Sequence, residues 1–135
     1  MEKRKGGNPM GDRVSISFVN TDLQMFQRES VTLFNHWGGT NFVEEARAYV
    51  KDLFHEVGDN TCSPIDRLEP NTVMVDFIRH ITKDEERITG NLYLGKDSNE
   101  GDNSDNGHYQ IELSRSKVNK LVNGMYGKKK KGGQR

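Results

Sequence analysis

The segment GKDSNEGDNSDNGHY, residues 95–109, is rich in side-chain oxygen atoms that could bind a metal ion. Within it, Asp102, Ser104 and Asn106 stand at alternate positions before Gly107, as in the first half of a calcium-binding loop. Carboxylate, hydroxyl and amide oxygens are hard ligands of the kind that calcium prefers. Calcium is therefore the cofactor that this pattern suggests, and its candidate ligands are Asp102, Ser104, Asp105 and Asn106.

The second half of the calcium pattern does not follow. The twelfth position should hold a bidentate glutamate, but it holds Leu113, and Glu112 lies one residue early. On an alternating strand, a shift of one residue points a side chain to the opposite face. The alternative is a solvated loop, because Asn, Asp, Ser and Gly favour turns. A connection of about twelve residues is nevertheless much longer than a hairpin needs, and long ordered loops are often functional.

A second candidate site is the segment NHWGGT, residues 35–40, where a strand is followed by a helix. Free backbone N–H groups at a helix start attract anions, and paired glycines let a ligand approach the backbone closely. A histidine there could add a proton or a metal contact. Alternatively, Trp37 covers one end of the core and the glycines form a tight turn. The candidate ligand-binding residues are His36, Trp37, Gly38, Gly39, Thr40 and His108.

Patterns typical of nucleophilic or phosphate-binding enzymes do not occur in the sequence. There is no G-x-S-x-G and no G-x-x-x-x-G-K-[ST]. A single cysteine, Cys62, excludes both an internal disulfide and a cysteine-rich zinc site. Among four scattered histidines, His36 and His108 lie at or near the ends of predicted strands. If these ends share one edge of the sheet, the two histidines could converge.

The elements that must position these residues follow from hydrophobic periodicity. Val14, Ile16 and Phe18 alternate with serines, which predicts a half-buried strand. Residues 30–37, 88–94 and 108–114 predict three further strands. A helical stripe with Thr40 or Asn41 as its cap and Gly58 at its end comprises Phe42, Ala46, Tyr49, Val50, Leu53, Phe54 and Val57.

Pro70 suits the first turn of a second helix over residues 70–82, although VMVDFI could also form a buried strand. Residues 116–126 predict a short last helix. The order β-β-α-α-β-β predicts one α+β domain, with an antiparallel sheet of about four strands and helices on one face. We expect this domain to span residues 14–126, between disordered tails at 1–13 and 127–135.

Charge is distributed unevenly although the formal net charge is zero. Residues 1–13 and 114–135 together hold 12 of the 20 basic and 2 of the 20 acidic side chains. The remaining residues, 14–113, hold 8 basic and 18 acidic side chains, a net charge of −10. An acidic body repels nucleic acid, so only the basic tails could bind phosphate. We therefore expect no nucleic-acid partner.

Three segments resemble a group of small, uncharacterised prokaryotic and phage-associated proteins: VTLFNHWGG, RLEP, and LYLG with GDNSDNGHY. Members of that group also pair an HWGG turn with an acidic, asparagine-rich loop that ends in GHY. The group has no established activity, so the resemblance implies no catalytic role. It does imply that eight residues form one shared feature: His36, Trp37, Gly38, Gly39, Asp102, Asp105, Gly107 and His108.

These observations lead us to expect a ligand- or ion-binding module that uses the HWGG turn and the acidic loop at 95–108, rather than an enzyme. One alternative is a protein-interaction domain that contacts a partner through its acidic body and basic tails. Another is a small metal-dependent hydrolase that uses His36 and His108 with loop carboxylates. No apolar run approaches the ~18 residues of a membrane span, and no secretory signal is present. We therefore expect a cytoplasmic protein with no membrane partner.

Overall fold

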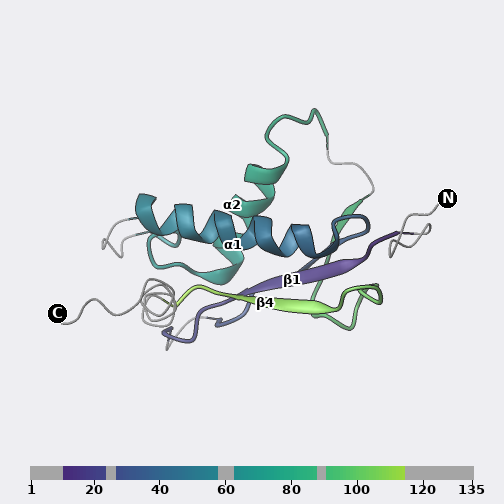
Figure 1. Cartoon of the computed structure of the whole chain (residues 1–135). Helices are drawn as coiled ribbons and strands as arrows, with labels where there is room; N and C mark the ends of the chain where they lie inside the picture. The colour runs from purple at the N-terminus through teal and green to yellow at the C-terminus, as the bar shows by residue number, and fades with distance from the viewer. Residues whose placement is uncertain (1–10, 24–26, 58–62, 88–90, 115–135) are drawn as a thin grey trace, which may run out of the picture.

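A computed structural model describes residues 11–23, 27–57, 63–87 and 91–114 of the chain (Figure 1). They form one small α+β domain, which confirms the predicted fold class and the order of its elements. The elements are β1 (Val14–Val19), β2 (Thr32–Asn35), α1 (Gly39–Glu56), α2 (Pro70–Ile81), β3 (Leu92–Gly95) and β4 (His108–Glu112). The predicted helix at 116–126 and the expected helix stop at Gly58 lie outside the described residues.

The four strands form one mixed sheet in the order β3-β2-β1-β4. Antiparallel pairing joins β1 to β2 and β2 to β3, whereas β4 pairs with β1 in parallel. The prediction of a purely antiparallel sheet is therefore wrong. β3 and β4 are the two edge strands of the sheet. The connection between them must cross three interstrand spacings of about 4.8 Å, which accounts for its length.

Both helices cover the same face of the sheet, as predicted (Figure 1). Val14, Ile16 and Phe18 of β1 belong to the core on that face, together with the apolar stripes of α1 and α2. The ring of Phe18 lies 5.5 Å from that of Phe77 and 6.2 Å from that of Tyr49. This aromatic cluster holds the two helices against the central strand.

The helix starts test two local predictions. Pro70 is the first residue of α2, so residues 70–81 form the expected helix and not the alternative strand. In contrast, α1 begins at Gly39 with Gly38 as its N-cap and no side-chain cap hydrogen bond, so the prediction that Thr40 or Asn41 caps this helix is wrong. The backbone N–H of Gly39 instead donates to the carbonyl oxygen of Asp12. The carbonyl of Asp12 therefore satisfies an N–H group at the start of α1, which is the role that we expected a side-chain cap to have.

The N-terminal boundary of the domain differs from the prediction. Residues 11–13, assigned from the sequence to a disordered tail, form backbone hydrogen bonds with the domain. The N–H of Asp12 donates to the carbonyl of His36 at 2.8 Å, and the carbonyl of Arg13 accepts from the N–H of Asn106 at 2.9 Å. This segment thus joins the HWGG turn to the acidic loop.

No helix within the described residues is long and apolar enough to cross a membrane.

Candidate functional site

The face of the sheet opposite the helices is covered, and over β1 and β4 it is polar. Ser15 and Ser17 alternate with the core residues of β1, and neither has exposed surface. The prediction of a half-buried β1 is therefore wrong, because both of its faces are buried. On the adjacent β4, His108 pairs with Ser15 and Gln110 pairs with Ser17. Four polar side chains consequently lie side by side on this face.

A change of register brings a carboxylate to the same face. Ile16 pairs with Leu33, but Val19 pairs with Glu29, so three residues (30–32) oppose two (17 and 18) between these two pairs. One extra residue of this kind is a β-bulge, which can redirect neighbouring side chains. The carboxylate of Glu29 accepts a 2.6 Å hydrogen bond from the hydroxyl of Ser17. The bulge therefore places Glu29 beside β1 and β4.

The polar side chains form one directed chain of hydrogen bonds. Ser17 gives its only hydroxyl proton to Glu29, so its oxygen accepts from Nε2–H of His108 at 3.1 Å. A neutral imidazole has only one N–H group, so Nδ1 accepts from the hydroxyl of Ser15 at 2.8 Å. The amide of Asn103 in turn donates to Ser15 at 2.8 Å. The network therefore assigns the Nε2–H tautomer to His108.

Burial favours the neutral form of this histidine. Desolvation lowers the pKa of His108 below its ordinary value of 6.5, and the nearby carboxylate of Glu29 opposes that effect. The Nε2 atom of His108 lies 4.0 Å from Oε2 of Glu29. At neutral pH the ring is therefore uncharged and forms no ion pair with Glu29.

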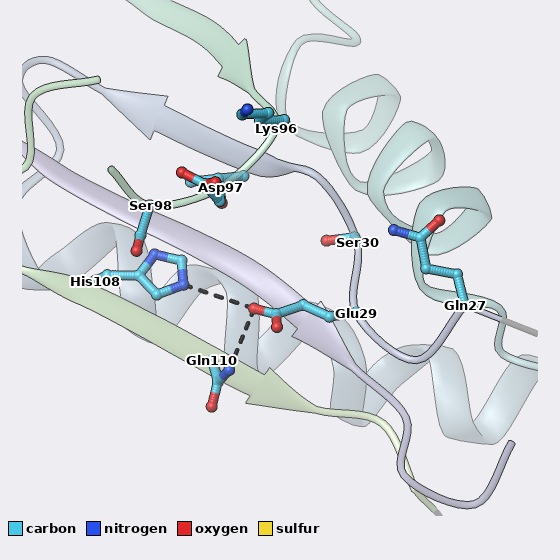
Figure 2. A pocket seen from close by; sticks show the side chains of 9 residues that line it. Gln27, Glu29, Ser30, Lys96, Asp97, Ser98, His108 and Gln110 are labelled. Atoms are coloured by element: carbon cyan, nitrogen blue, oxygen red, sulfur yellow. Dashed lines mark hydrogen bonds and ion pairs between the residues drawn. The ribbon is translucent and has the colours of Figure 1, made fainter. Parts of the chain in front are cut away.

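A cavity of about 290 Å³ opens beside this network (Figure 2). The start of the acidic loop, the segment before β2, and β4 each contribute to its wall. Figure 2 shows the contacts from Glu29 to His108 and Gln110 at its edge. The residues that line it are Gln27, Glu29, Ser30, Thr32, Lys96, Asp97, Ser98, His108 and Gln110.

The acidic loop is held over the polar face by ring packing and hydrogen bonds. The rings of Phe34 and Tyr93 are stacked with centroids 4.9 Å apart, and Gly101 packs directly against both. The N–H of Asp102 donates to the Tyr93 hydroxyl at 2.9 Å. Asn103 donates to the carbonyl of Ser98 at 3.1 Å. These contacts fix the part of the loop that borders the cavity.

The candidate metal ligands Asp102 and Asp105 surround a cation that the chain itself provides. The guanidinium of Arg13 donates to Asp105 at 2.9 Å and to Asp102 at 3.0 Å. The pKa of Asp102 is lowered mainly by hydrogen bonds from Ser104, with a further contribution from the charge of Arg13. Calcium binding at these carboxylates stays a prediction, and it would require Arg13 to be displaced.

The other two candidate metal ligands have structural partners. The N–H of Ser104 donates to Asp102 at 3.0 Å, as in an Asx turn. The side-chain amide of Asn106 donates to the carboxylate of Asp12 at 2.6 Å and to the carbonyl of Arg13 at 3.1 Å. Within the described residues, no group of three or more His, Cys, Asp or Glu side chains is arranged to hold a metal ion.

Both glycines of the HWGG turn have structural reasons to be glycine. Gly39 has a φ of +59°, and a Cβ atom there would collide with the carboxylate of Asp12. A Cβ atom on Gly38 would lie 2.7 Å from both the Asn35 amide nitrogen and the Phe42 Cβ atom. A carboxylate of the chain thus packs against the first residue of α1, where the sequence suggested an external anion. Anion binding by this turn stays a prediction.

The remaining residues of the turn do not line the cavity. Trp37 is 48 % exposed and packs edge-on against His36, with ring centroids 4.9 Å apart. Its exposure contradicts the alternative in which it covers one end of the core. Thr40 lies on the exposed surface of α1. Of the six candidate ligand-binding residues, only His108 borders the cavity.

Several residues of this site were missed in the sequence, although part of the signal was there. The serines of β1 and the residues His108 and Gln110 recur with period two, which marks one polar face on each strand. Nothing in the local sequence indicated that Glu29 would reach the same face, because a bulge places it there.

Comparison of the chain with family models, curated proteins and solved structures finds no match. The resemblance to the HWGG proteins therefore stays a prediction.

Proposed function

We propose that the protein is a binding module for a small polar ligand and that the cavity beside His108 is its binding site. The observation that carries this proposal is the pre-oriented carboxylate of Glu29 at the cavity wall. Its Oε2 atom accepts from Ser17 at 2.6 Å and from Gln110 at 3.2 Å. A side chain fixed before binding loses little conformational entropy when a ligand arrives. The volume of about 290 Å³ fits a small ligand.

This proposal keeps one part of the expected site and changes the other. The acidic loop contributes Lys96, Asp97 and Ser98 to the cavity, and His108 follows it. The HWGG turn supports the same region indirectly, because Asp12 bonds to both His36 and Asn106. The protein-interaction role and the cytoplasmic location stay predictions.

Binding is favoured over hydrolysis by the connectivity of the polar network. In a Ser-His-Asp triad the carboxylate bonds to the histidine nitrogen that faces away from the serine. Here the carboxylate of Glu29 bonds to Ser17, and the second histidine nitrogen bonds to Ser15. Ser17 also has no exposed surface, so its oxygen cannot reach a substrate. The arrangement fixes the carboxylate rather than activating a serine.

An NMR titration of the full chain tests the proposal. The probes are n-butylamine, propionate, phenyl phosphate and glucose, each added at millimolar concentration. We expect at least one probe to shift the amide signals of Thr32, Ser98 and Gln110 in a saturable manner, while the signals of α1 stay unchanged. If no probe shifts these three signals, or if every shift occurs elsewhere, the cavity is not a binding site for small polar ligands.

A further inference from the structure

We propose that the ligand carries a primary ammonium group, which binds through the carboxylates of Glu29 and Asp97 and the hydroxyl of Thr32. This inference rests on the proposed function of the cavity and adds the chemical class of its ligand. The ammonium group could belong to a free amine or to a lysine side chain, because both present the same three N–H donors.

The charge of the cavity favours a cation. Two carboxylates, those of Glu29 and Asp97, line it together with one ammonium group, that of Lys96. His108 contributes no positive charge at neutral pH, because burial lowers its pKa. One negative charge therefore remains in excess at the cavity wall. The net charge of −10 on residues 14–113 attracts cations to the same body.

Two carboxylate oxygens among the residues that line the cavity keep unused capacity to accept hydrogen bonds. Oε2 of Glu29 is occupied by Ser17 and Gln110, while its Oε1 accepts no hydrogen bond from the residues that the structure describes. Oδ1 of Asp97 accepts from the N–H of Asn99 at 2.9 Å. Its Oδ2 is the second carboxylate oxygen that accepts no hydrogen bond from the described residues. An ammonium group has donors only, so it complements these two oxygens.

Thr32 provides an independent reason to expect a ligand. Its side chain lines the cavity and the residue is only 1 % exposed, yet its hydroxyl has no hydrogen-bond partner within the described part of the chain. The Thr32 hydroxyl can therefore accept a hydrogen bond from a group that enters the cavity. Its cross-strand neighbour is Gly95, which has no side chain to satisfy it. A ligand N–H in the cavity would satisfy the Thr32 oxygen.

The test compares n-butylamine with n-butanol, its neutral analogue, by calorimetry and NMR on the full chain. We expect n-butylamine to bind at least about tenfold more tightly, because hydrogen bonds to ionised groups are the stronger ones. The variant Glu29→Gln should lose at least about tenfold in affinity for the amine. Its control, Glu45→Gln, removes the same charge from the exposed side of α1 and should bind as the wild type does.

A second arm uses Nα-acetyl-lysine N-methylamide as the probe. Binding of this compound supports the ammonium group and assigns a protein lysine as its source, whereas binding of n-butylamine alone assigns a free amine. Failure of both compounds to bind overturns the inference. So does equal binding of n-butylamine by Glu29→Gln and the wild type. If propionate, phenyl phosphate or glucose occupies the cavity while both amines fail, the proposed function stands and only the ligand class is wrong.

Discussion

Replacing Gly101 with alanine should destabilise the protein by lifting the acidic loop from the sheet. The added Cβ atom would lie 2.7 Å from ring carbons of both Phe34 and Tyr93, closer than real Cβ atoms approach their neighbours. Phe34 has no exposed surface, and its ring is stacked on that of Tyr93 with an interplanar angle of 5°. Neither ring can move without disturbing the stack, so we expect an overpacking cost of about 1–3 kcal/mol.

Urea denaturation of Gly101→Ala, Phe34→Leu and the double variant measures this cost and assigns it to the ring. If the clash involves Phe34, the single effects should not add, and the coupling energy should be about 0.5–3 kcal/mol. Gly107→Ala is the matched control, because Gly107 has a φ of +86° but no atoms within 4 Å of the added Cβ. It should lose stability through backbone strain alone and show no coupling to Phe34. Additive effects of Gly101→Ala and Phe34→Leu would refute this reasoning.

Three further predictions concern the remaining contacts. Gly39→Ala should cost at least about 1–2 kcal/mol in urea denaturation, because φ is +59° and the new Cβ collides with Asp12; a neutral effect would contradict that geometry. Arg13→Gln should bind calcium more tightly than the wild type in calorimetry, since it removes the cation that bonds both loop carboxylates; equal affinities would contradict this account. The lowered pKa of His108 should make stability fall as the pH drops below 6.5 toward the folded-state pKa, since the unfolded chain then binds the proton more readily. Replacing His108 with asparagine should flatten this part of the stability–pH profile, and an unchanged profile would contradict the assignment.

The elements that could be predicted from the sequence are those defined by local periodicity. The stripe from Phe42 to Leu53 is buried in α1, and Pro70 begins α2. Val14, Ile16 and Phe18 face the core as their alternation predicts. In each case the pattern lies within one element, so neighbouring residues carry enough information to reveal it.

Features that depend on pairing between distant segments could not be predicted in this way. The parallel pairing of β4 with β1 joins residues more than ninety positions apart, such as Ser15 and His108, and makes the connection between β3 and β4 cross the sheet. Arg13 looked like part of a charged tail, yet it bonds to Asp102 and Asp105. The cavity itself arises from this crossing, so its lining residues come from three separate segments.

The central claim is that the cavity is the ligand site, and blocking it tests that claim most directly. Ser98 borders the cavity, whereas the adjacent Asn99 is exposed and does not. The measurement is the dissociation constant of n-butylamine, or of whichever probe binds best, for Ser98→Trp, Asn99→Trp and the wild type. We predict that Ser98→Trp loses at least about tenfold in affinity, which corresponds to ~1.4 kcal/mol, while Asn99→Trp binds as the wild type does. Equal binding by all three proteins would contradict the account.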